Sequence, residues 1–312
     1  MILPKPPSLF ENLTGQGLDK IPAETLEQTT LETLYLDQNQ LSNLEGITQL
    51  TQLKKLSAYH NSITALPKNI ALLSHLEFIN ISANQLQSLP DEVGQLTQLK
   101  NLDVQHNKIS LLPETVTQLE NLEFLYTAGN QLTQLPRNLH HLKKLVYINI
   151  SNNQFAKLPD NIGELTHLIE LRCYNNALTA LPNTIGHLTA LKELHAMNNQ
   201  LQTLPASLGQ LKNLRKLILT DNAMSSLPDS LGHLTNLTDL DLRSNKLTAL
   251  PNSLGQLSRL RSLDLRDNQL TTLPDSLCEL TSLERLDVRL NKYFTIPTWF
   301  ETLKNRGVTV FT

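Results

Sequence analysis

An asparagine recurs at almost constant spacing along the chain. The first step is 22 residues, and the next ten steps are 23 residues each. The series is Asn39, Asn61, Asn84, Asn107, Asn130, Asn153, Asn176, Asn199, Asn222, Asn245, Asn268 and Asn291. Each asparagine is the ninth residue of the frame L-x-x-L-x-L-x-x-N-x-L, with conservative exchanges. A fixed period of this length predicts a solenoid of stacked coils, which grows by addition and needs no central core.

Within each repeat, positions 1, 4, 6 and 11 are apolar, whereas positions 3, 5 and 7 are mostly polar or aromatic. This alternation predicts a short strand, and strands at the same phase must lie parallel. The other half of the repeat, for example Leu204, Pro205, Leu208, Gly209 and Leu211, predicts a crossover with one or two turns of α- or 3₁₀-helix. We expect the asparagine to face inward and to bond backbone groups, which gives a ladder between coils.

The frame resembles the leucine-rich repeat over residues 31–305. Its 23-residue L-P-x-x-I-G-x-L form is similar to that of bacterial leucine-rich repeat proteins and of plant intracellular Ras-group-related ones. The resemblance implies an α/β solenoid, the leucine-rich repeat horseshoe, with a parallel β-sheet on the concave face and short α/3₁₀ turns on the convex face. The first repeat departs from the pattern at Leu44, Glu45, Gly46 and Ile47, and is similar to the shorter repeats of phosphatase-regulatory proteins.

The repeat register suggests three segments: an N-terminal half-repeat cap (1–30), twelve leucine-rich repeats (31–305) and a C-terminal capping strand (306–312). The N-terminus lacks the apolar segment of a signal peptide, and no apolar run is long enough to cross a bilayer. Cys173 and Cys278 do not form the disulfide-bonded caps of many extracellular repeat proteins. We therefore expect a cytoplasmic protein, or an effector delivered to a host cytosol.

Composition and motifs argue against several kinds of site. The net charge of -3 gives no basic excess for nucleic acid or an anionic membrane. No phosphate-binding loop or nucleophile motif is present, so we expect no enzyme and no cofactor. His60 and His106 are two repeats apart, His140 and His141 are adjacent on the convex side, and His195 has no second ligand at tetrahedral spacing. These positions predict no metal site. We also expect the protein to be a monomer.

Aromatic side chains concentrate at the strand positions of repeats 1 to 8, beside small residues such as Ala128 and Gly129. Large rings with little rotamer entropy are typical of interaction hot spots, so we expect a protein or peptide partner here. Simple cross-strand stacking of the rings is the alternative. The predicted partner-binding residues are Tyr35, Tyr59, Phe78, Asp103, Phe124, Tyr126, Tyr147, Arg172, Tyr174 and His195.

Charged residues replace the aromatic ones in repeats 10 to 12. An aspartate column and an arginine column lie two residues apart: Asp241, Asp264 and Asp287, then Arg243, Arg266 and Arg289. The strip is either a self-paired surface ladder or a docking surface for a charged partner, and the first interpretation is favoured because paired charges recognise poorly.

Two other functions are compatible with the sequence. The chain could be the recognition scaffold of a bacterial effector or ubiquitin-ligase system whose catalytic part is elsewhere. It could also be a weak glycan or small-molecule sensor that uses the aromatic floor together with Asn80, Asn101, Asp103 and Asn149.

Overall fold

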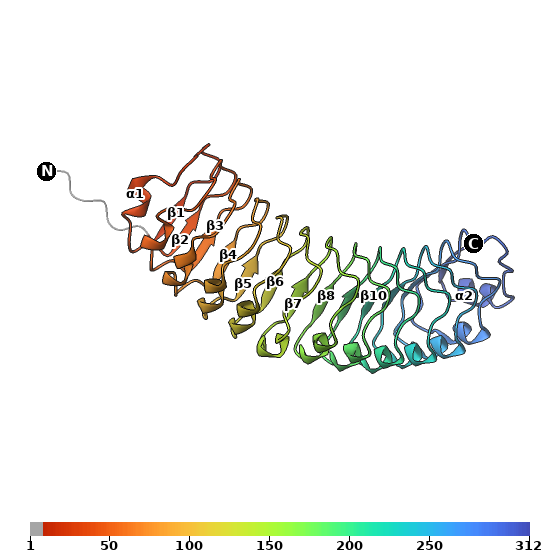
Figure 1. Cartoon of the computed structure of the whole chain (residues 1–312). Coiled ribbons are helices and arrows are strands. Elements are labelled where there is room, and N and C mark those ends of the chain that lie inside the picture. The colour runs from red at the N-terminus through yellow and green to blue at the C-terminus, as the bar shows by residue number, and fades with distance from the viewer. Residues whose placement is uncertain (1–8) are drawn as a thin grey trace. The chain divides into compact units, whose positions relative to one another are not determined.

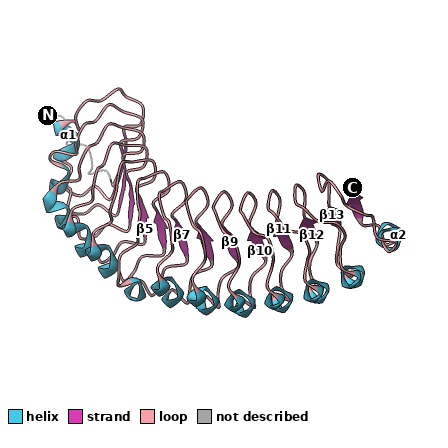
Figure 2. Cartoon of the chain, turned by 45° about the vertical axis from the view of Figure 1, so that its right-hand side comes forward, coloured by secondary structure: helices cyan, strands magenta, loops and turns pink. Residues whose placement is uncertain are grey.

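The computed structural model describes residues 9–312, so residues 1–8 of the predicted N-terminal cap lie outside the described residues. The chain divides into two compact units, Met1–Asn153 and Gln154–Thr312, and each is described by itself. In both units, strands line one side of the coils and short helical turns line the opposite side (Figures 1 and 2). We call the first side the strand face.

The first unit repeats one strand and one helical turn. Its described strands are β1 (Phe10–Asn12), β2 (Thr33–Tyr35), β3 (Lys55–Ser57), β4 (Phe78–Asn80), β5 (Asn101–Asp103), β6 (Phe124–Tyr126) and β7 (Tyr147–Asn149). Its helices are α1 (Ala23–Leu26) and the 3₁₀ turns η1 (Ile47–Gln49), η2 (Lys68–Leu72), η3 (Asp91–Gln95), η4 (Glu114–Gln118) and η5 (Leu139–His141).

The second unit continues the same alternation. Its strands are β8 (Glu170–Arg172), β9 (Glu193–His195), β10 (Lys216–Ile218), β11 (Asp239–Asp241), β12 (Ser262–Asp264), β13 (Arg285–Asp287) and β14 (Thr309–Phe311). Its helices are η6 (Asp160–Glu164), η7 (Asn183–His187), η8 (Ala206–Gln210), η9 (Asp229–His233), η10 (Asn252–Gln256), η11 (Asp275–Glu279) and α2 (Phe300–Asn305).

Neighbouring strands within each unit pair in parallel and in repeat register. Phe78 of β4 lies opposite Asn101 of β5, which lies opposite Phe124 of β6. Each strand position therefore forms a row across the sheet, and residues a period apart become neighbours about 4.8 Å from strand to strand. The predicted parallel sheet with short 3₁₀ connections is confirmed.

The repeated asparagine holds consecutive coils together. Asn84 donates from Nδ2 to the carbonyl oxygens of Ile81 and Ser82 in its own turn, at 3.2 and 3.1 Å. It also donates to Ala58 O of the preceding coil at 2.9 Å, and its Oδ1 accepts the Ile63 N–H of that coil. The residue is 3% exposed, so these bonds satisfy backbone groups that water cannot reach. The predicted ladder is confirmed.

The residue before each asparagine has a left-handed backbone, which turns the chain sharply after the strand. Those with positive φ are Gln38, His60, Ala83, His106, Gly129, Asn152, Asn175, Asn198, Asp221, Ser244, Asp267 and Leu290. Asn, Asp and Gly tolerate this conformation best, which explains their frequency at the position. Leu290 is the costly member, with φ of 63° and a side chain 76% exposed.

The helical side depends on close approach of neighbouring turns. A Cβ added to Gly94 would clash with the carbonyl oxygen of Thr115 in the next repeat, so glycine permits this close packing. In the short first repeat, Gly46 instead adopts φ of 80° and precedes η1. Among the described residues, no helix is both long and apolar enough to cross a membrane.

Candidate functional site

Three aromatic rings meet on the strand face of the first unit, and we call Phe124, Tyr126 and Tyr147 the aromatic trio. Phe124 and Tyr126 point from β6, and Tyr147 points from β7 opposite Phe124. The Tyr126 and Tyr147 ring centroids lie 4.8 Å apart, and each lies 6.4 Å from the Phe124 ring centroid. All three side chains are half-buried, so the trio combines mutual packing with an accessible surface.

Strand β5 borders the trio with polar groups in a partly dry environment. Asp103 lies opposite Tyr126 in the sheet, and burial raises the pKa of its carboxyl group, although hydrogen bonds from Gln105 oppose that shift. The Oδ1 atom of Asn101 is buried without a hydrogen-bond partner. Small buried side chains follow the strands, with Ala128 at 3% and Ser151 at 0% exposure. The trio thus stands beside a low floor and hydrogen-bonding groups.

The other predicted aromatic residues do not join the trio. Tyr35 packs edge-on against Phe10, with centroids 5.7 Å apart, and Tyr59 lies beside His60. Phe78 lies in the same row as Phe124, but strand β5 lies between their strands, so β4 and β6 are about 9–10 Å apart. Tyr174 belongs to the second unit. Of the seven predicted aromatic residues, the ring contacts in the described part of the chain join Phe124, Tyr126 and Tyr147, and the wider set of partner-binding residues stays a prediction.

Strand position 5 is less free than the sequence pattern suggested. Asp103 accepts the backbone N–H of Gln105, Asn149 accepts that of Ser151, and Asp241 accepts that of Arg243. A short Asn or Asp there satisfies the backbone where the strand ends. The predicted binding residue Asp103 consequently has a structural role that would exist without any partner.

The charged strip of the second unit is a ladder of paired groups. Arg243 contacts both carboxylate oxygens of Asp241, and Arg266 contacts both of Asp264, at 2.7–3.1 Å. Each arginine also reaches the aspartate of the next strand, with Arg243 Nε 3.6 Å from Asp264 and Arg266 Nε 3.5 Å from Asp287. These contacts have the geometry of the self-paired ladder.

Asp287 is the most buried carboxylate of the ladder, with a side chain 0% exposed. Burial by itself would raise its pKa, but hydrogen bonds from the side chain and backbone of Arg289 and from Arg285 outweigh burial and lower the pKa. Both guanidinium groups also lie over the Phe311 ring of β14, at 4.8 and 5.0 Å from its centroid. The terminal strand thereby covers the end of the ladder.

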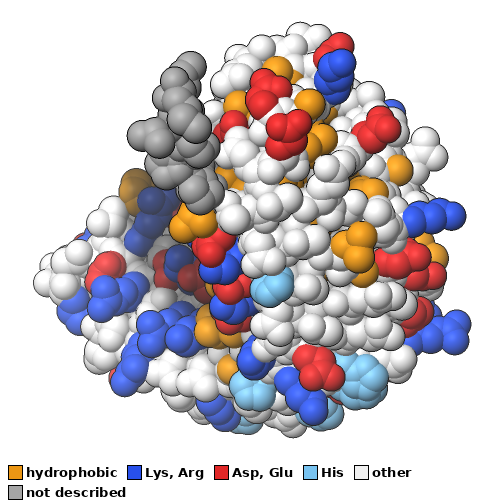
Figure 3. All heavy atoms as spheres, turned by 90° about the vertical axis from the view of Figure 1, so that its left-hand side faces the viewer, with side chains coloured by type: hydrophobic (Ala, Val, Ile, Leu, Met, Phe, Trp, Pro, Cys, Tyr) orange, Lys and Arg blue, Asp and Glu red, His pale blue; other side chains and the backbone are white. Residues whose placement is uncertain are grey.

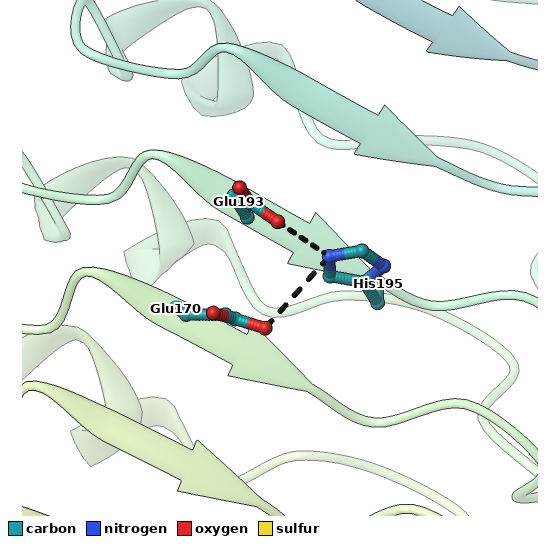
Figure 4. Close-up of side chains that lie close together, drawn as sticks. All are labelled: Glu170, Glu193 and His195. Carbon is teal, nitrogen blue, oxygen red and sulfur yellow. Dashed lines mark hydrogen bonds and ion pairs between the residues drawn. The ribbon is translucent and has the colours of Figure 1, made fainter.

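A third cluster lies on β8 and β9. Glu193 Oε2 is 3.0 Å from His195 Nε2, and Glu170 Oε1 is 3.9 Å from the same nitrogen (Figure 4). The prediction that His195 has no neighbouring ligand is wrong, because register places Glu170 directly opposite Glu193, and the histidine beside both. The signal in the sequence was that Glu170 and Glu193 both occupy strand position 3, while His195 occupies position 5 of the same repeat as Glu193.

Cationic side chains balance this cluster. Arg172, another predicted binding residue, bonds Glu170 Oε1 through Nε, and Lys216 lies 3.4 Å from Glu193 Oε1. Burial would raise the pKa of Glu193, yet its contacts with His195 and Lys216 lower it. Arg172 and His195 therefore belong to a polar network on β8 and β9, whereas the aromatic trio lies on β6 and β7.

Neither cysteine has the surroundings of a nucleophile. Cys173 is fully buried, which raises its pKa to about 12, so the thiolate is scarce at neutral pH. Cys278 stands in η11 where other repeats have glycine, and is partly exposed. Cys173 packs as a small apolar side chain in the core.

The face drawn in Figure 3 shows acidic and basic side chains interspersed among polar surface. Nucleic-acid binding normally needs a continuous basic stripe, and that face has none of this kind. The prediction that nucleic acid is not a ligand stays a prediction for the molecule as a whole.

Comparisons with known proteins agree with the repeat fold described above. The family described as "Leucine-rich repeat region" matches residues 23–133 and 124–240, and "Leucine rich repeat" matches residues 212–270 and 235–293. The Leptospira interrogans LRR protein LIC12759 has a similar solved structure, with 31% identity, a TM-score of 0.74, and 96% of this chain and 95% of that chain covered.

Two further similarities cover smaller parts of the other proteins. The Arabidopsis receptor kinase HAESA, solved in complex with the peptide hormone IDA and the co-receptor SERK1, is 26% identical with a TM-score of 0.67, over 93% of this chain and 58% of that chain. The human volume-regulated anion channel subunit LRRC8E is 32% identical over 85 residues, 26% of this chain, and the match spans only 11% of that protein. The chain belongs to the leucine-rich repeat family.

Proposed function

We propose that this chain binds a protein or peptide partner on the strand face of its first unit, with the aromatic trio as the anchor. Leucine-rich repeat proteins generally mediate protein–protein interactions, which supports a protein partner. The observation that carries the specific site is the meeting of Phe124, Tyr126 and Tyr147 across two strands while all three stay half-exposed.

Energetics favour this surface over the charged ladder. A partner side chain that covers the trio buries the exposed part of rings whose rotamers are already restricted by mutual contacts, so little rotamer entropy is lost on binding. In the ladder, by contrast, each arginine is already bonded to a carboxylate, so part of its charge and hydrogen-bonding capacity is satisfied before a partner arrives. Asp103 offers a partly exposed hydrogen-bond acceptor next to the rings, which suits an extended segment with free backbone N–H groups.

The structural comparison supports a peptide as one form of partner. HAESA, whose structure resembles this chain, was solved with a peptide hormone bound. At 26% identity, HAESA supports a shared fold and peptide binding as a general use of that fold. The choice of partner for this chain rests on the chemistry of the trio.

The test is selection of peptides on the whole chain, with a Phe124→Ala/Tyr126→Ala double variant as the counter-target. We expect selected peptides to bind the double variant at least about tenfold more weakly, since hot-spot aromatics contribute 2 kcal/mol or more. Tyr59→Ala is the matched control, because Tyr59 is a strand-face ring outside the trio, and should leave affinity unchanged. Equal binding to the double variant, with its fold intact by circular dichroism, would overturn the proposal.

A further inference from the structure

The cluster of Glu170, Glu193 and His195 lies in the second unit and is not used by the proposed partner site. One imidazole nitrogen and two carboxylate oxygens, one from each residue, lie within 4.8 Å of one another. All three point from neighbouring strands toward the same space (Figure 4). Side-chain exposures of 20%, 29% and 16%, respectively, leave that space sheltered but open to solvent.

The distances fit a small divalent ion. With metal–ligand bonds of about 2.0–2.1 Å and tetrahedral angles, ligand atoms lie about 3.4 Å apart. The distances from His195 Nε2, 3.0 Å to Glu193 and 3.9 Å to Glu170, lie on either side of that value. The carboxylate torsions are broad, so modest rotations of the two glutamates would bring the three atoms into place.

The sheet itself supplies a reason for a cation here. Glu170 and Glu193 are directly opposite in register, an arrangement of like charges that destabilises a sheet. Arg172 lies opposite His195 in the sheet and bonds Glu170 Oε1 through Nε, and Lys216 lies 3.4 Å from Glu193 Oε1. An ion bound here would replace the Arg172 contact with Glu170, and the Arg172 side chain, which is 37% exposed, would turn to water. A cation placed there would interact with both carboxylates at once and join two adjacent repeats.

We propose that Glu170, Glu193 and His195 form a binding site for a divalent transition metal ion of the Zn²⁺ type. Imidazole with carboxylates suits Zn²⁺ over Mg²⁺, which prefers oxygen ligands and keeps its water shell. Bound to the ion through Nε2, the imidazole is neutral and carries its hydrogen on Nδ1. Three protein ligands leave a coordination position for water, on the strand face.

Calorimetric titration of the whole chain with Zn²⁺ tests the site. We expect one ion bound per chain and a rise in melting temperature with Zn²⁺ concentration, because an ion that binds only the folded state stabilises it. Glu193→Gln should weaken binding at least about tenfold, since even residues that only support a metal ligand contribute 10–100-fold. His195→Gln keeps a hydrogen-bonding side chain for Glu193 but should also lose the ion.

Two variants separate this site from unspecific binding. Lys216→Gln removes a positive charge next to Glu193 and should strengthen Zn²⁺ binding several-fold. His140→Ala/His141→Ala removes an adjacent histidine pair on η5, whose rings lie 4.2 Å apart, and should leave the affinity unchanged. Loss of binding in that control, no loss in His195→Gln, or equal binding of Mg²⁺ would each overturn the proposal.

Discussion

The aromatic trio of the first unit occupies strand positions 3 and 5 of its repeats, and the charged ladder of the second unit occupies positions 5 and 7. In the trio, side chains contact one another through apolar surface and stay half-exposed. In the ladder, every carboxylate is already bonded to the arginine two residues further along its own repeat. An aromatic surface keeps its binding capacity while it packs, whereas a charge that is fully paired has little left for a partner.

The largest losses of stability are expected from changes in the asparagine ladder, which both regions share. Asn107 and Asn268 make equivalent sets of bonds, with three carbonyl oxygens accepting from Nδ2 and one backbone N–H donated to Oδ1. Leucine at either position leaves buried backbone groups unsatisfied, at a cost of about 2–4 kcal/mol in unfolding free energy. Denaturant unfolding should give similar losses for both variants. A large difference between them would show that the two regions do not share one scaffold.

Asp287→Asn should break the ladder at its most buried point. We expect a loss of about 2 kcal/mol, less than for a fully buried pair, because the arginines around Asp287 are 27–46% exposed and can turn to water. Denaturant unfolding at neutral pH measures this loss. A value near zero would mean that the ladder contributes no net stability.

The same variant has a defined pH dependence. The folded-state pKa of Asp287 is lowered, so its stabilisation is present above the ordinary value of 3.8 and disappears as pH falls through the lower folded value. The difference in unfolding free energy between wild type and Asp287→Asn should therefore be constant near neutrality and shrink below about pH 3.8. A difference that persists unchanged in acid would contradict the assignment.

Tyr126→Ala should sharpen the contrast from the aromatic side. The ring is half-buried and packs on Tyr147, so its removal should cost about 1–2 kcal/mol of stability. Tyr59→Ala, with a ring 37% exposed and next to His60, should cost less than about 0.5 kcal/mol. Thermal melts of the two variants compare them directly, and equal costs would show that the trio packs no better than an isolated surface ring.

Asp103→Asn should give the smallest effect, and in the stabilising direction. Burial raises the folded-state pKa of Asp103, so its charge opposes folding once pH exceeds that value. Asparagine keeps the acceptor for the Gln105 N–H, as Asn80 and Asn149 do in their own repeats. We expect a gain below about 1 kcal/mol at pH 7, fading as the pH is lowered. A loss of stability would contradict burial as the cause.

The repeat pattern was sufficient to predict the parallel strands, the 3₁₀ turns and the inward asparagines. Each depends on contacts one period apart, and the period is visible in the sequence. Rows of residues were also predictable, and the paired ladder of Asp241, Asp264 and Asp287 with its arginines followed from them. Ring orientation was not predictable, since rows give neighbours only, and the contact of Tyr35 with Phe10 is visible only in the structure.

The sequence by itself determined the fold, the Asn ladder and the two-column charge strip, because these follow from periodicity and strand spacing. Tertiary structure alone decided which rings touch, that Asp103 also serves its own backbone, and that Glu170, Glu193 and His195 converge. These outcomes depend on side-chain rotamers and on contacts diagonal to the rows, and a linear pattern does not encode either of them. The asparagine period fixes the repeat position of every residue, and the side-chain directions decide what each position can bind.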